Sequence, residues 1–182
     1  MTVKVQTFEQ LALEEPTEKW ELFLGRVRKK PAMTMEHYDI AFELAFTIRS
    51  QISHDEFHVR CDQGRLSTAT SCLVPDVFVV SATQALQFRG MDSTLEAYAD
   101  PVQFVAEVWS RSTGDYDVAG KLAEYQSRGD AEIWLIHPYE HRVTGFRRDA
   151  AGAYGTGETL TGRVTLSGLP GVAIDLDRLL GS

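Results

Sequence analysis

The sequence lacks the features that mark several common classes of protein. Its 182 residues include only two cysteines, Cys61 and Cys72, and no CxxC pair, so neither a disulfide framework nor a zinc cluster is indicated. No apolar run approaches the roughly 20 residues that span a bilayer, and no basic patch followed by an apolar stretch opens the chain. We therefore expect a cytoplasmic protein with free thiols and no membrane partner.

Positive charge is also scarce. Lys and Arg number 18 against 26 Asp and Glu, which gives a formal net charge of -8. Non-specific affinity for nucleic acids comes largely from basic residues that neutralise phosphates, so this balance argues against a broadly basic binding surface. Local basic patches are still present, a first at Arg26, Arg28, Lys29 and Lys30 and a weaker second at Arg142, Arg147 and Arg148.

No repeat, low-complexity tract or linker rich in Pro, Gly and Ser divides the chain. A hydrophobic fraction of 43% and a charged fraction of 24% are typical of ordinary globular proteins. Because the length is that of one common domain with a core of its own, we expect a single domain over residues 1–182.

The first half of the chain is predicted to combine helices with hairpins. A short helix is expected within the first 20 residues, and WELFLGRVR over residues 20–28 is typical of a hairpin that turns at Gly25. Thr34 is a suitable N-cap for a helix whose apolar stripe comprises Tyr38, Ala41, Leu44, Ala45, Ile48 and Ile52. FHVRC and LSTATSC follow as strands, with a hairpin turn expected at residues 62–64.

The second half alternates buried strands with a helix. LVPDVFVV and PVQFVAEVW are apolar strands, and a helix is expected from about Asp115, as N-cap, to Arg128, with Gly129 just beyond its end. AEIWLIHP is the next strand, and the polar HRVTGFRR pairs back on it. The order predicts a mixed α/β (α+β) fold, a mixed sheet flanked by helices.

Three ionisable residues occupy positions that the local periodicity assigns to apolar side chains. A period of two places Asp76 on the strand face of Val74, Phe78 and Val80. Glu107 shares a face with Val105 and Trp109 in the same way. On the following helix, Lys121 stands in one stripe with Val118, Leu122 and Tyr125.

Burying any of these charges alone would cost several kcal/mol, so we expect them to meet each other, a metal or water. Two adjacent carboxylates repel unless a cation neutralises them, and Mg²⁺ favours one or two carboxylates plus waters. A structural alternative remains open, in which the Asp caps a turn and the Glu pairs with the Lys in a salt bridge.

Several segments together resemble a known family. WELFLGRV, PDVFVV, EVWSRST and DYDVAGKLAEYQSRGDAEIWLIHP, in this order, are similar to the Uma-type restriction endonuclease family, a bacterial group within the PD-(D/E)XK nuclease superfamily. The resemblance runs from about Trp20 to Pro138, and the closing GLPGVAIDLDRLL also resembles the family's usual ending. It implies a restriction-endonuclease-like fold in which Asp76 and Glu107 bind the metal.

The resemblance also implies roles for further residues. The wider superfamily has a lysine two residues beyond the second acid, where this chain has Trp109, so the lysine function falls to Lys121. His37 and Glu21 match a histidine and an acid of the family, although a helix-start histidine bonded to backbone and an exposed glutamate remain alternatives. We expect Mg²⁺ or Mn²⁺ between Asp76, Glu107 and the backbone carbonyl of Val108.

The expected function is hydrolysis of DNA phosphodiester bonds by a metal-dependent endonuclease, with Asp76, Glu107, Lys121 and His37 at the catalytic site. The family resemblance also implies a homodimer. The alternative is a nuclease-like fold without catalysis that serves as a binding or interaction module, which the acidic composition favours.

Overall fold

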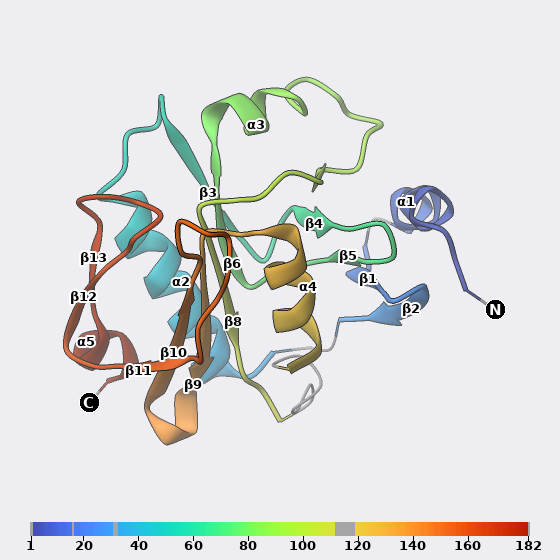
Figure 1. Ribbon diagram of the computed structural model, residues 1–182. Helices are drawn as coiled ribbons and strands as arrows, with labels where there is room; N and C mark the ends of the chain where they lie inside the picture. The colour runs from blue at the N-terminus through green and yellow to red at the C-terminus, as the bar shows by residue number, and fades with distance from the viewer. Residues whose placement is uncertain (1, 16, 31–32, 112–118, 182) are drawn as a thin grey trace.

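The computed structural model describes residues 2–15, 17–30, 33–111 and 119–181. In this part of the chain, two larger sheets and one two-stranded ladder make up the β-structure (Figure 1). The six-stranded sheet has the order β11-β10-β9-β8-β6-β3, comprising Glu158–Leu160, Arg142–Arg147, Glu132–His137, Phe104–Val108, Val77–Ser81 and Phe57–Cys61. The five-stranded sheet has the order β2-β1-β5-β4-β7, comprising Arg26–Lys29, Trp20–Phe23, Cys72–Leu73, Arg65–Ser67 and Ala97–Tyr98.

The ladder pairs β12 (Arg163–Thr165) with β13 (Ala173–Asp175). The helices described are α1 (Val5–Glu14), α2 (Met35–Arg49), α3 (Ala82–Leu86), α4 (Lys121–Arg128) and α5 (Leu176–Leu180), with a short 3₁₀ turn η2 at Pro138–Glu140. Neighbouring strands of the six-stranded sheet run antiparallel except β8 and β9, which are parallel. The predicted mixed sheet flanked by helices is confirmed.

Strand alternation divides the core into two layers. Val77 and Val79 of β6 pack in a cluster with α2 and α5, whereas Phe78 and Val80 pack in a second cluster that includes Tyr125 of α4. In β8, Val105 likewise belongs to the α4 layer. Asp76 and Glu107 therefore fall on the sheet face that α4 covers, as their spacing predicts.

Three local predictions are confirmed. The β1–β2 hairpin turns at Leu24 and Gly25, both with positive φ (47° and 74°), which matches the twist of a two-residue hairpin. The Thr34 side chain accepts a hydrogen bond from the N–H of His37 at 3.4 Å, and α2 begins at the residue after Thr34. Gly129 ends α4 in the left-handed conformation, with φ 83°.

Two local predictions are wrong, and one lies outside the described residues. Tyr38 is exposed, because the buried stripe of α2 runs through His37, Ile40, Ala41, Leu44, Ala45 and Ile48. FHVRC and LSTATSC do not form a hairpin: β3 pairs with β6, whereas β4 pairs with β5 and β7 in the other sheet. Positive φ at Asp62 and Gly64 redirects the chain from one sheet to the other. The predicted cap at Asp115 is among the residues not described.

Among the described residues, no helix combines the length and the apolar character that crossing a bilayer requires.

Candidate active site

Two neighbouring strands bring the predicted acids together. β6 and β8 pair antiparallel, with Val77 opposite Ala106. Extending this register by one residue places Asp76, which directly precedes β6, opposite Glu107 in β8. Both side chains are buried, with exposed fractions of 1% and 3%. Opposite residues of an antiparallel pair are the closest cross-strand neighbours, so the two carboxylates belong to one site.

Asp76 is held by three donors from three parts of the chain. Its Oδ1 accepts from Nζ of Lys30 at 2.8 Å. Its Oδ2 accepts from the backbone N–H of Val108 at 2.7 Å and lies 2.9 Å from Nε2 of His37. His37 is buried in the first turn of α2, so the N-cap that starts this helix also places the imidazole beside the acid.

Glu107 is held from α4. Its Oε1 accepts from the hydroxyl of Tyr125 at 2.5 Å and lies 3.3 Å from Nζ of Lys121. Lys121 also donates to Oε1 of Glu21 at 2.9 Å, and the same Glu21 oxygen accepts from the N–H of Val74 at 2.8 Å. Because Lys121 and Tyr125 are four residues apart on a helix, both reach the carboxylates from one face of α4.

The surroundings drive the pKa values of the two acids apart. Burial alone raises the pKa of Asp76, but the charge of Lys30 and the hydrogen bond from His37 outweigh it and hold that pKa well below its usual range. Burial raises the pKa of Glu107 to about 8; the Lys121 charge opposes this effect and the Asp76 charge adds to it. Asp76 is therefore an anion at neutral pH, whereas Glu107 is mostly protonated unless a further cation is near.

Lys30 is the counter-ion on which Asp76 depends. Its Nζ also donates to the carbonyl of Val74 at 3.0 Å and to Oδ1 of Asp62 at 3.1 Å. Burial lowers the pKa of Lys30, but the negative charges of Asp76, Glu107 and Glu21 together outweigh it and raise that pKa above its ordinary value. The amine is therefore charged at any physiological pH.

The donor set fits a hard divalent cation such as Mg²⁺. Two carboxylates on one sheet face supply the protein ligands that Mg²⁺ takes when waters complete its shell. Nδ1 of His37 is a buried polar atom with no hydrogen-bond partner among the described residues, as expected beside a site that admits water or a ligand. In the described part of the chain, no three or more His, Cys, Asp or Glu side chains form a metal-binding group, so an all-protein cage is absent there.

The structure brings Asp76, Glu107, Lys121 and His37 to one place, and Glu21 joins them. Val108 contacts Asp76 through its N–H, and its carbonyl as a metal ligand stays a prediction. Ser110, in the EVWSRST segment, is buried, whereas Thr113 of that segment lies outside the described residues, as does Val118 of the helix stripe.

Two residues that contact the acids, Lys30 and Tyr125, were not predicted from the sequence. Lys30 belongs to a basic run with Arg26, Arg28 and Lys29, and only its pairing with Asp76, 46 residues away, distinguishes it. Tyr125 falls in the apolar stripe of its helix, yet its hydroxyl donates to Glu107. A tyrosine one turn after an inward lysine is a signal that could have suggested this bond.

The Asp76–Lys30 pair generates a stability prediction. We expect Lys30→Met to lower the free energy of unfolding by about 3–5 kcal/mol, because it leaves a buried carboxylate without its counter-ion. Urea denaturation measures this change. Lys29→Met is the matched control, since the exposed Lys29 forms only a surface pair with Glu18, worth at most about 1 kcal/mol. Equal losses for the two variants would contradict the role assigned to Lys30.

Comparisons with known proteins show the family and the fold of this chain. The crystal structure of "a putative nuclease belonging to DUF820" from Anabaena variabilis ATCC 29413 is similar, with a TM-score of 0.80, 18% identity and 98% of both chains covered. At this identity the likeness shows the fold, and the expected restriction-endonuclease-like architecture is confirmed. No curated protein matches the chain. Residues 5–178 match the model of the Uma2 family, described as "Putative restriction endonuclease". Because this match spans nearly the whole sequence, the chain belongs to the Uma2 family of restriction-endonuclease-like nucleases.

Proposed function

We propose that this protein is a metal-dependent endonuclease that hydrolyses phosphodiester bonds of DNA. The observation that carries the proposal is the meeting of two buried carboxylates, Asp76 and Glu107, with the buried amine of Lys121 on one sheet face. A third acid, Glu21, and a second lysine, Lys30, join them, and charged groups gathered and perturbed in one place mark a candidate functional site.

Asp76, Glu107 and the carbonyl of Val108 would hold Mg²⁺ or Mn²⁺. When bound, such an ion lowers the pKa of a coordinated water and polarises the scissile phosphate. Lys30 and the N–H of Val108 keep Asp76 ionised and oriented for this role.

The remaining side chains act on the phosphate or on the acids. Lys121, fixed between Glu21 and Glu107, orients the attacking water and stabilises charge that develops on the phosphoryl oxygens. His37 is a positioning residue, because its Nε2–H contacts Asp76, and Tyr125 orients Glu107 in the same way.

A second candidate function is a nuclease-like fold that binds a partner without catalysis. The observation in its favour is that Asp76, Glu107 and Glu21 are buried and that each already has an amine partner. This candidate expects no cleavage of any nucleic acid with any divalent metal. The proposed endonuclease expects cleavage that requires the metal.

We expect Glu107→Gln and Lys121→Met to lower DNA cleavage in Mg²⁺ or Mn²⁺ by at least about 100-fold, the usual loss when a group that stabilises transition-state charge is removed. The amide oxygen that Glu107→Gln introduces would still accept from Tyr125, so this variant should fold, and circular dichroism checks this. The control is Asp92→Asn, an exposed carboxylate outside the site. Wild-type rates in both site variants would refute the proposed chemistry.

Metal binding itself is predicted to stabilise the fold. A ligand bound only by the native state adds about 2.7 kcal/mol at 100 times its Kd, which corresponds to a rise in Tm of about 5–10 °C for a chain of this size. A thermal-shift titration with MnCl₂ should show this rise in wild type and in Asp92→Asn. Glu107→Gln should show little of it; the same rise in that variant would place the metal elsewhere.

We also propose that the protein forms a homodimer through the solvent face of α2. Tyr38, Phe42 and Phe46 are each more than half exposed on this face, and the two Phe rings stack at 6.5 Å. Glu36 lies in the first turn of the helix and Arg49 in its last turn. Two copies paired antiparallel would therefore place acidic residues against basic ones around an aromatic centre, as a two-fold interface requires.

Phe42→Glu tests this interface. Truncating a central aromatic residue typically weakens association about 10-fold or more, and the added charge would repel the acids nearby. Size-exclusion chromatography with light scattering should show twice the chain mass for wild type and a monomer for the variant. Met91→Glu, on an exposed loop, is the control. A monomeric wild type would contradict the proposal.

A further inference from the structure

A pocket lies beside the candidate active site, on the same face of the six-stranded sheet. Strand register makes the relation explicit: Glu107 pairs with Leu135, and Leu135 pairs with Thr144. Arg142 pairs with His137 one row further along. Leu135, Thr144, His137 and Arg142 all line the pocket. Leu135 and Thr144 are therefore cross-strand neighbours in the same row as Glu107, and His137 and Arg142 form the next row on this face, about 7 Å further along the strands.

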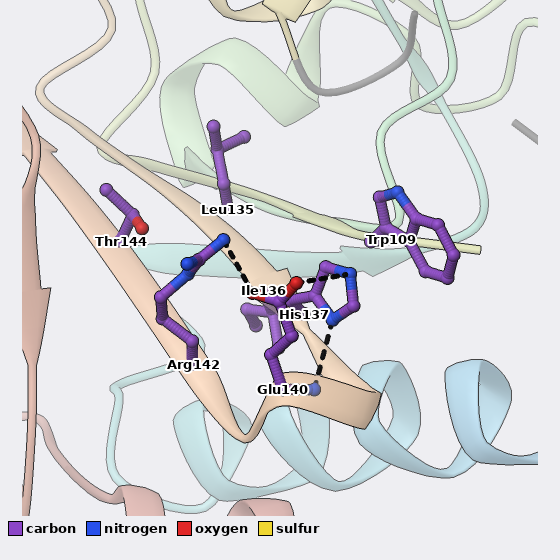
Figure 2. Close-up of a pocket in the computed structure, with 7 residues that line it drawn as sticks. All are labelled: Trp109, Leu135, Ile136, His137, Glu140, Arg142 and Thr144. Atoms are coloured by element: carbon purple, nitrogen blue, oxygen red, sulfur yellow. Dashed lines mark hydrogen bonds and ion pairs between the residues drawn. The ribbon is translucent and has the colours of Figure 1, made fainter. Parts of the chain in front are cut away.

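The walls of this pocket are aromatic on one side and polar on the other. Figure 2 shows Trp109 at one side and Arg142 and Thr144 at the other, with His137 and Glu140 between them. Trp109 is the second residue after Glu107 and stacks on His137, with ring centroids 4.4 Å apart and an interplanar angle of 22°. The pocket volume of about 330 Å³ is within the range of about 300–1,000 Å³ that small-molecule sites occupy.

The polar groups of the pocket are fixed in place. Arg142 pairs with Glu140 at 2.7 Å, and Nδ1 of His137 accepts from the backbone N–H of Glu140 at 3.1 Å. Arg142 and Glu140 are both about half exposed, so they present a donor and an acceptor at the rim. The carboxylate of Glu140 disfavours a phosphate inside the pocket, whereas a flat neutral heterocycle with donors and acceptors on its edge suits both the aromatic wall and the polar rim.

The opposite side of the Trp109–His137 stack carries a basic group. A second hollow, of about 500 Å³, is lined by Thr34, Trp109, Arg111, His137 and Tyr139. Tyr139 packs edge-on against Trp109, with centroids 6.0 Å apart. Arg111, an exposed residue, is the charged side chain among the described residues that line this hollow, and the carboxylate of Glu36 lies at its edge, 3.5 Å from the hydroxyl of Tyr139. The aromatic stack thus lies between a pocket that suits an uncharged ring and a hollow lined by one basic side chain.

We propose that the first pocket binds an unpaired nucleobase next to the scissile phosphate, with the stacked Trp109–His137 pair as its aromatic wall and Arg142 and Glu140 at its edge. Arg111 attracts the sugar–phosphate chain on the other side of the stack. This assignment rests on the proposed nuclease function and specifies its substrate class: DNA that is single-stranded or carries an unpaired nucleotide at the cleavage point. A base within an intact duplex is already paired and stacked, and it must be unstacked before it can enter.

Binding without metal tests the pocket separately from cleavage. In EDTA, we expect wild type to bind a fluorescent single-stranded 12-mer more tightly than the matching duplex. We also expect it to bind more tightly than an abasic 12-mer, which keeps the phosphates and lacks the bases. Trp109→Ala should weaken binding of the single strand about 5- to 150-fold, the range found when a base-stacking aromatic residue is removed. Binding of the abasic strand should change little.

Further variants keep the proposal testable if Trp109→Ala folds poorly. Trp109→Phe keeps an aromatic wall and should retain most of the affinity, while quenching of tryptophan fluorescence by the single strand should disappear, because only Trp20 and Trp134 remain. Arg142→Ala changes an exposed side chain and should also reduce the preference for the base-containing strand. Leu86→Ala, an exposed apolar residue on α3 after the other end of β6, is the matched control.

The outcomes separate this inference from the function on which it rests. Equal affinity for the single strand and the abasic strand, or unchanged base preference in both Trp109→Ala and Arg142→Ala, would overturn the pocket assignment. Metal-dependent cleavage would be unaffected by that result. Base-dependent binding that Trp109→Ala abolishes would support the pocket even if no metal produces cleavage, and the absence of cleavage would then count against the endonuclease alone.

Discussion

The buried contact between Asp76 and Lys30 is the constraint on which the site depends. An unpaired carboxylate at this depth would take up a proton or destabilise the fold, so the ion pair is what allows Asp76 to remain an anion among apolar strands. The contact also joins the two sheets, because Lys30 directly follows β2 of the five-stranded sheet and Asp76 directly precedes β6 of the six-stranded sheet. The charge of the site and the packing of the sheets are therefore coupled.

The second acid is in a different electrostatic state, and this asymmetry suits a metal centre. Burial raises the pKa of Glu107 to about 8 against the opposing charge of Lys121, so at neutral pH it holds a proton more readily than Asp76 does, and additional positive charge nearby favours its ionised form. Asp76 remains ionised throughout. A protein with one permanent and one inducible anion can keep its core stable before a divalent cation binds, because it does not hold two repelling charges side by side.

The sheet also organises what surrounds the acids. The row of side chains that contains Glu107 continues through Leu135 and Thr144, and the next row contains Trp109, His137 and Arg142. Glu107 of the candidate site and the stacked Trp109–His137 pair thus lie on one face of the sheet formed by β8, β9 and β10. Under the proposed function, this arrangement would connect the bond to be cleaved with the bases beside it through strand register.

Much of this could be predicted from local sequence, because it depends on periodicity. Alternation in β6 and β8 placed Asp76 and Glu107 on the α4 face, helical spacing turned Lys121 inward, and the hairpin at Gly25 followed from turn chemistry. The prediction failed for the strand FHVRC, which pairs with β6 and not with the strand that follows it in the sequence. It also failed for Tyr38, which is exposed because α2 carries apolar residues on both its buried and its solvent face. The sequence by itself determined which residues break the pattern. Only the tertiary structure decided that Lys30 and Tyr125 pair with them, since hydrogen bonds over 46 and 18 residues depend on how the elements pack and leave no local periodicity.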